Sequence, residues 1–497
     1  MHPFFACITA IALAGGLRAQ PPDLVAESQR GKQLMAAGKF AEAAHVYEEI
    51  VRAVPNSAGM LVNLGMARYM AHQPEKAIPP LESALKIQPG ILPALLFLGA
   101  SYLQTGAPAK AIVPLGRVVQ AKPDMAQARQ MLGDALAGVG RLEEAAEHYR
   151  HWARLDPSNP QAWYTLGLTY ETLSQQVFGE LEGTAPESAE MLALVAEVRV
   201  TEKQYRSAYF LYHEALKRRP DMRGLYAGLA AVYEATGHRD WAKTAMEREE
   251  GIPGPDCSVD RAECAFGQGD DLAVIKLTAG KKTPGALYWR ARAFSRLAAE
   301  AFVKLNQLPP SLEGHELMAR VHRAQGRHLE AVREWRNALK LAPGDPALER
   351  ELAISLHQSR NFKEAQAVFA RLLKKDPGSA ELNFYLGDCL LNLQRVEEAI
   401  PYLEKSVRAD PKFLGARSSL ARAYLAVHRG ADAIPHLRAA LPIDRDGSLH
   451  YQLARALREA GDLAAAREMM RKYQEIRRNK ENERRELEKA AEIRAPE

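Results

Sequence analysis

The sequence repeats with a period of 34 residues, and this period constrains the fold more than any other feature of the chain. Prolines recur at that step at four successive places, and glycines recur at the same step in a second register. The prolines are Pro55, Pro89, Pro123 and Pro157, and the glycines are Gly31, Gly65, Gly99, Gly133 and Gly167. A period of about 20 to 50 residues indicates small units that stack on their neighbours. The length of 497 residues therefore does not require several separate globular cores.

The repeat can be followed through eleven units, each numbered from 1 to 34. The units begin at residues 24, 58, 92, 126, 189, 223, 312, 346, 380, 414 and 447. Position 8 is Gly or Ala in all eleven units, and position 20 is Ala in all eleven. Small residues at these two places let the backbones of two antiparallel helices approach closely. Position 32 is proline in eight units, where it ends the second helix.

These residues resemble the tetratricopeptide repeat (TPR) family, whose unit is a helix–turn–helix of 34 residues. Trp163 to Tyr170 and Leu386-Gly387 carry the pattern of the first helix, and Gly38 to Ala43 carries that of the turn. The resemblance implies an all-α fold, a right-handed superhelical α-solenoid of antiparallel helix pairs. We expect about eleven to twelve units and an irregular central segment.

The middle of the chain departs from the repeat. No turn signal follows Tyr170, so the pattern predicts one long helix over about 160–182, and a second long helix begins near Ala286. The two align at an offset of 124 residues, with Tyr170 on Phe294 and Phe178 on Phe302. We interpret this likeness as an internal duplication, and the alternative is a chance likeness of two apolar helices.

These patterns divide the chain into five parts. They are a signal peptide (1–19), an N-terminal TPR array containing the long helix (20–250), an irregular connector with two cysteines (251–285), the second long helix with a C-terminal TPR array (286–480), and a charged helix or tail (481–497).

The N-terminus carries the pattern of a secretory signal. Phe4 to Ala14 is an apolar run, and the small residue Ala19 precedes Gln20. The pattern is imperfect because His2 replaces the usual Lys or Arg, and the alternative is a buried N-terminal helix. We expect export to the periplasm with cleavage between Ala19 and Gln20. No later apolar run reaches the ~20 residues of a membrane-spanning helix, so we expect no transmembrane span in the mature chain.

Composition and motifs argue against catalysis and nucleic-acid binding. Lys and Arg number 66 against 61 Asp and Glu, and this net charge of +5 is too dilute for a nucleic-acid partner. The sequence contains no catalytic, phosphate-binding or metal-binding motif, so we expect no catalytic residues, no cofactor and no metal. Cys257 and Cys264 lie in the irregular connector, where an oxidising compartment would favour a disulfide between them. The alternative is two buried thiols.

The family resemblance also implies which residues of the first helices line the inner groove. The N-terminal array would present an apolar, Met-rich lining suited to a peptide or helix: Val62, Met66, Met70, Leu96, Phe97, Leu103 and Met131. The C-terminal array would present arginines beside aromatics, suited to an acidic partner: Arg320, Arg323, Arg350, Phe384, Tyr385, Arg422, Tyr451, Arg455 and Arg458. The alternative is that these residues only pack against the next repeat.

The sequence therefore predicts a non-enzymatic, exported scaffold that binds a protein or peptide partner in its concave groove. Two other roles remain open. One is an accessory subunit of an envelope assembly for secretion, pili or polysaccharide export, and the other is a regulatory partner of a separate enzyme.

Overall fold

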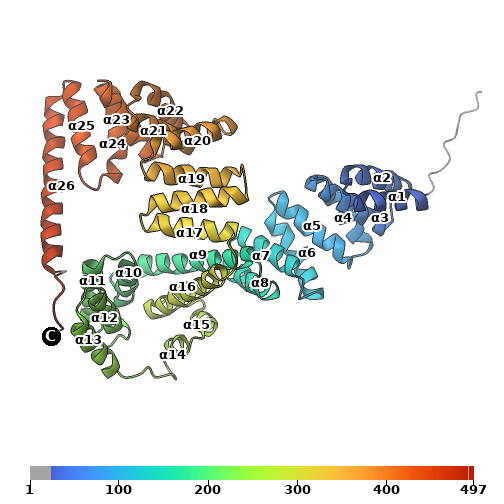
Figure 1. Ribbon diagram of the computed structural model, residues 1–497, viewed down its shortest axis with the longest axis horizontal. Coiled ribbons are helices and arrows are strands. Elements are labelled where there is room, and N and C mark those ends of the chain that lie inside the picture. Colours follow the sequence, from blue (N-terminus) through green and yellow to red (C-terminus); the bar gives the residue numbers. More distant parts are fainter. Residues whose placement is uncertain (1–23, 491, 497) are drawn as a thin grey trace, which may run out of the picture. The chain divides into compact units, whose positions relative to one another are not determined.

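The computed structural model describes residues 24–490 and 492–496. The predicted signal peptide, 1–19, lies outside the described residues. The described part folds into 26 α-helices and one short 3₁₀ helix, without a strand. The chain divides into two compact units between Asp156 and Pro157. The predicted all-α solenoid of helix pairs is confirmed, and Figure 1 labels its helices.

The first unit consists of four helix pairs. Its helices are α1 (Leu24–Ala36), α2 (Phe40–Ala53), α3 (Ala58–Met70), α4 (Pro74–Ile87), α5 (Leu92–Gln104), α6 (Pro108–Ala121), α7 (Ala126–Gly138) and α8 (Leu142–Leu155). Consecutive helices pack against each other along the whole series.

Within each pair, the small residues at positions 8 and 20 set the approach of the two helices. A Cβ atom at Gly65 of α3 would lie 2.4 Å from the Leu81 side chain of α4, and the next pair repeats this contact between Gly99 and Leu115. The position-20 residue Ala77 has no exposed surface. A larger side chain at either place would force the helices apart, which explains the strict pattern in the sequence.

The second unit begins with two helix pairs and two short helices that lie between a pair of long helices. The long helices are α9 (Pro160–Thr184) and α16 (Pro284–Asn306). Between them come α10 (Ala189–Thr201), α11 (Tyr205–Arg218), α12 (Leu225–Ala235), α13 (Arg239–Gly251), α14 (Arg261–Gly267) and α15 (Asp271–Thr278).

Five further helix pairs complete the second unit. They are α17 (Leu312–Ala324), α18 (His328–Leu341), α19 (Pro346–Gln358), α20 (Phe362–Lys375), α21 (Ala380–Asn392), α22 (Val396–Ala409), α23 (Leu414–Ala426), α24 (Gly430–Ala440), α25 (Ser448–Glu459) and α26 (Leu463–Ala490), with the 3₁₀ turn Leu441–Ile443 after α24. Their buried side chains form one continuous core from Ala319 to Ala466. In the described part of the chain, no helix combines the length and the apolar character needed to cross a bilayer.

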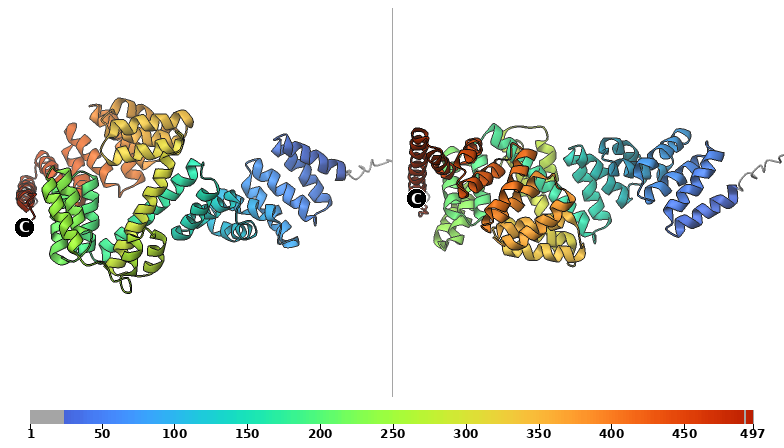
Figure 2. Two further views of the ribbon diagram at one scale, coloured as in Figure 1. Left: turned by 60° about the horizontal axis from the view of Figure 1, so that its bottom comes forward. Right: turned by 90° about the horizontal axis from the view of Figure 1, so that it is seen from above.

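The long helices α9 and α16 pack against each other, as Figure 1 and Figure 2 show. A Cβ atom at Gly167 would lie 2.4 Å from the Phe302 ring, so Phe302 fills the place that the second helix of the same repeat fills elsewhere. The Tyr170 and Phe294 rings stack 6.1 Å apart. Helix α16 thus completes the repeat that α9 begins, and α10 to α15 are inserted between its two halves.

The contact between α9 and α16 can be tested with two glycines of α9. We expect Gly167→Ala to destabilise the protein by about 1–3 kcal/mol, because the new methyl group meets the Phe302 ring. A Cβ atom at Gly179 would have no other atom within 4 Å, so Gly179→Ala should be neutral or stabilising, by up to ~1 kcal/mol. Urea unfolding of both variants measures the difference. Equal midpoints would contradict this packing.

Candidate functional site

The predicted apolar lining of the first unit lies on three consecutive first helices, α3, α5 and α7. Val62 is only 6% exposed and belongs to the core, so its assignment to the accessible lining is wrong. The other residues keep partial exposure: Met70 is 38% exposed, and Met66, Leu96, Phe97, Leu103 and Met131 are half-buried.

Phe97 occupies the middle of this row. Its ring meets the Tyr69 ring of the preceding first helix edge-on, with 5.3 Å between the centroids. The Gln104 amide donates a hydrogen bond of 2.9 Å to the Tyr69 hydroxyl, which fixes the tyrosine. Phe97 is therefore oriented on one side by a neighbouring repeat, while part of its surface stays exposed.

Most of the predicted basic lining in the second unit is neutralised inside the array. Arg323 pairs with Glu351, and Arg350 pairs with Glu381 of the following repeat. Arg320 lies 3.6 Å from Glu171 of α9. These three arginines are therefore already paired with acidic side chains of this chain, with which an acidic partner would compete. These ion pairs were not predicted from the sequence, because the basic positions of each repeat were considered without the acidic positions of the elements that pack against it.

Arg422 also has an internal partner, the buried carboxylate of Asp388, 2.8 Å away. Asp388 further accepts hydrogen bonds from the Ser419 hydroxyl at 2.8 Å and from His357 Nε2 at 2.9 Å. Burial alone would raise the pKa of Asp388, but the hydrogen bond from His357 and the charge of Arg422 hold it below its usual range. Asp388 therefore joins three successive repeats through their first helices.

The predicted aromatic residues divide into packed and open ones. Tyr385 stacks face to face on Phe369 at 4.9 Å, and Phe384 contacts Phe413 at 4.8 Å, so both serve the packing of the array. Tyr451 on α25 is 41% exposed. Arg455 and Arg458 of the same helix are exposed and form no ion pair with any described residue. Among the residues predicted for the basic lining, these three on α25 are exposed and lack an ion pair with any described residue.

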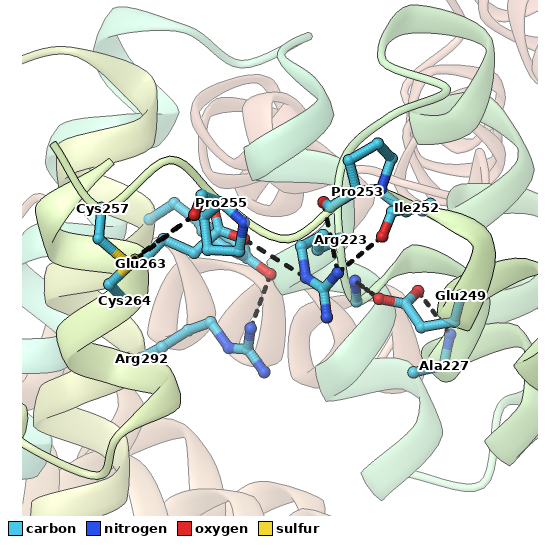
Figure 3. Close-up of polar contacts among 12 residues, drawn as sticks. Arg223, Ala227, Glu249, Ile252, Pro253, Pro255, Cys257, Glu263, Cys264 and Arg292 are labelled. Atoms are coloured by element: carbon cyan, nitrogen blue, oxygen red, sulfur yellow. Dashed lines mark hydrogen bonds and ion pairs between the residues drawn. A yellow bond between two sulfur atoms is a disulfide. The ribbon is translucent and has the colours of Figure 1, made fainter. Parts of the chain in front are cut away.

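The irregular connector lines a polar cleft together with the start of α10, the α11–α12 loop and the start of α16. A disulfide joins Cys257 and Cys264, with 5.7 Å between their Cα atoms, and fastens the loop to α14 (Figure 3). The Arg223 guanidinium donates to the carbonyl oxygens of Ile252, at 3.0 Å, and of Pro253, at 3.5 Å. The loop is therefore held at both of its ends.

Buried acids hold the walls of this cleft. The Glu249 carboxylate accepts hydrogen bonds from the backbone N–H groups of Gly224, at 2.7 Å, and Ala227, at 3.3 Å, and so caps the start of α12. Burial raises the pKa of Glu263, which lies 3.8 Å from Arg223. Sequence reasoning identified the cysteines here but not the acids, which carry no motif.

Arg292 of α16 lies next to the connector, where it lines a smaller cavity together with Cys257 and Cys264. The Arg292 guanidinium lies 4.8 Å from the ring centre of Phe266 and donates a hydrogen bond of 3.0 Å to the Tyr288 hydroxyl. It also pairs with Glu197 at 3.4 Å. The cleft encloses about 510 Å³, lined among others by Glu190, Arg219, Tyr288 and Trp289. Among its charged side chains, Glu190 pairs with Arg219 and Glu263 pairs with Arg223. No group of three metal-ligating side chains occurs in the described part of the chain.

Comparisons with known proteins agree with this architecture. Models described as tetratricopeptide repeat match residues 29–90, 350–412, 390–453 and 447–480, and a model described as TPR repeat matches residues 133–174. A comparison with curated proteins gave no match.

Solved structures of repeat proteins are similar to parts of the chain. MamA from Desulfovibrio magneticus RS-1 is 25% identical, with 30% of this chain and 85% of that chain covered and a TM-score of 0.29. A thermophilic TPR protein of Thermus thermophilus is 19% identical, with 37% of this chain and 100% of that chain covered and a TM-score of 0.29.

The role of Asp388 can be tested by removing its carboxylate. We expect Asp388→Ala to destabilise the protein by about 2 kcal/mol at pH 7, because four polar partners, Arg422, Ser419, His357 and Asn392, lose their acceptor. Glu381→Ala breaks a more exposed pair between neighbouring repeats and should cost less than about 1 kcal/mol. Urea unfolding of the two variants gives the comparison, and equal costs would contradict the role of Asp388.

The pH dependence follows from the lowered pKa of Asp388. The folded-state value lies below the unfolded-state value of about 4, so the stabilisation is fully present above that pH. It is lost as the pH falls through the folded-state pKa, and the difference between wild type and Asp388→Ala should shrink there.

Proposed function

Because the chain belongs to the tetratricopeptide repeat family, we propose that it is a non-enzymatic scaffold that binds a protein or peptide segment on the inner face of its first unit. The observation that carries this proposal is the row of partly exposed apolar side chains on α3, α5 and α7. The row contains three methionines, whose unbranched side chains adapt to differently shaped apolar ligands.

The ligand that suits this row is an amphipathic helix or an extended apolar peptide. Successive first helices supply Met66, Phe97 and Met131, so the open apolar surface continues across three repeats. A helical ligand presents apolar residues at i, i+3, i+4 and i+7, and such a stripe matches a continuous apolar groove. The second unit offers less for a charged partner, since its arginines are largely paired internally.

We also propose that the chain is exported to the periplasm. Two features support this proposal. One is the apolar run before Ala19, and the other is the disulfide between Cys257 and Cys264, a bond that persists in oxidising compartments.

The binding proposal can be tested with a phage-displayed library of peptides. Peptides selected on the protein should carry apolar residues at helical spacing. Phe97→Ala should weaken their binding by about thirtyfold, or ~2 kcal/mol, because it truncates the largest side chain of the row. Val113→Ala is the matched control, since Val113 is 68% exposed on the second helix α6.

Thermal unfolding should accompany this measurement. A melting temperature for Phe97→Ala close to that of the Val113→Ala protein separates a lost anchor from a damaged fold. Full binding by the Phe97→Ala protein would show that the ligand docks elsewhere.

Export can be tested on protein purified from its native cell. N-terminal sequencing should begin at Gln20, and alkylation without reduction should leave Cys257 and Cys264 unmodified. A protein that retains Met1 and in which Cys257 and Cys264 are alkylated would contradict both export and residence in an oxidising compartment.

A further inference from the structure

A segment near the end of the sequence returns to the front of the second unit. Helix α26 packs on α25 through its first turns, where Ala466 and Met469 join the core of the C-terminal array. The segment Glu492–Pro496 then lies against the repeats formed by α10 to α13, and Figure 1 and Figure 2 show the end of the chain there. The Tyr233 hydroxyl of α12 donates a hydrogen bond of 3.0 Å to the carbonyl oxygen of Arg494.

Two other repeats show what is unusual about Tyr233. Tyrosine at position 11 of a first helix donates its hydroxyl to a glutamate 20 residues earlier, on the preceding second helix. Tyr102 donates to Glu82 in this way, and Tyr424 donates to Glu404 at 2.7 Å.

At Tyr233 the residue 20 positions earlier is His213 instead of a glutamate. Tyr233 is only 1% exposed, so its hydroxyl is removed from water. A buried phenol that lacks an acceptor is destabilising, and a main-chain carbonyl supplies the acceptor that the missing carboxylate supplies elsewhere. The carbonyl of Arg494 takes that place, beside the Tyr209 side chain that also interacts with this hydroxyl.

The segment and the neighbouring repeats together form the walls of a recess. Thr236 and His238 of the α12–α13 turn line this recess together with Lys203 and Tyr205, and Ile493 of the segment lies in its wall. Ile493 is half-buried, although much of α26 before it is exposed. The segment is thus held by a partly buried hydrogen bond, and the Ile493 side chain next to it is half-buried.

We propose that the face of α10 to α13 around Tyr233 is a docking site whose occupant is the chain's own segment Glu492–Pro496. Tyr233 recognises a main-chain carbonyl, and the half-buried Ile493 lies next to it in sequence. Docking connects the last repeat of the C-terminal array back to the repeats inserted between α9 and α16. An extended peptide with a branched aliphatic residue before the recognised carbonyl competes for the same face.

The docking can be measured with a fluorophore on the full mature chain. Glu497→Cys supplies the labelling site in a Cys389→Ala background, since Cys257 and Cys264 are joined by the disulfide. Tyr233→Phe removes only the hydroxyl and should shift the ratio of docked to released segment about three- to tenfold toward release. The fluorescence anisotropy should fall accordingly. Tyr424→Phe is the matched control, because it removes the same group from an equivalent position that faces Glu404.

A second variant leaves α10 to α13 unchanged. Ile493→Asp places a charge on the half-buried side chain of the segment and should lower the anisotropy to that of a label on an undocked segment, with an unchanged melting temperature. Equal anisotropy in the wild-type and Ile493→Asp proteins would overturn the proposal. An equal fall in the Tyr233→Phe and Tyr424→Phe proteins would also overturn it, since the effect would then come from general loosening of the repeats.

Discussion

The whole architecture depends on how closely the two helices of each repeat approach. Glycine or alanine at position 8 leaves room for one large side chain of the partner helix, such as Leu81 against Gly65. Each such contact is local to one pair, so stability in a stacked array is approximately a sum over repeats and their interfaces. The array can therefore accept an insertion inside one repeat, provided that the contact itself is supplied. Phe302 of α16 makes this contact with Gly167 of α9, although α10 to α15 are inserted between the two helices in the sequence.

The sequence predicted the helix pairs well because their signals are local. The small residues and the prolines fall within one unit, and the observed helices follow them. The partner of α9 could not be predicted in the same way, since Phe302 lies far outside its unit and periodicity carries no information on distant contacts. The offset of 124 residues did pair Tyr170 with Phe294, whose rings meet in the structure. Two like helices that pack through equivalent residues favour the interpretation as a duplication.

Candidate surfaces were harder to predict, because a position in the repeat fixes the direction of a side chain but not its partners. Val62 occupies a lining position and is nevertheless buried. Arg323 and Arg350 lie 28 and 31 residues before the glutamates that neutralise them. Each pair crosses from one repeat to the next, where it contributes little energy but fixes which polar groups face each other. The cleft of the connector was predictable only at its two cysteines.

These differences separate the roles of the two units. In the second unit, buried and paired charges such as Asp388 with Arg422 satisfy one another, and a ligand would have to replace contacts that already exist. In the first unit, Phe97 and the methionines beside it have no competing polar partner to displace. A ligand there gains the apolar area that it covers, at roughly 25 cal/mol per Å², without breaking an internal ion pair. The proposed binding surface therefore lies on the first unit, where no internal ion pair has to be broken.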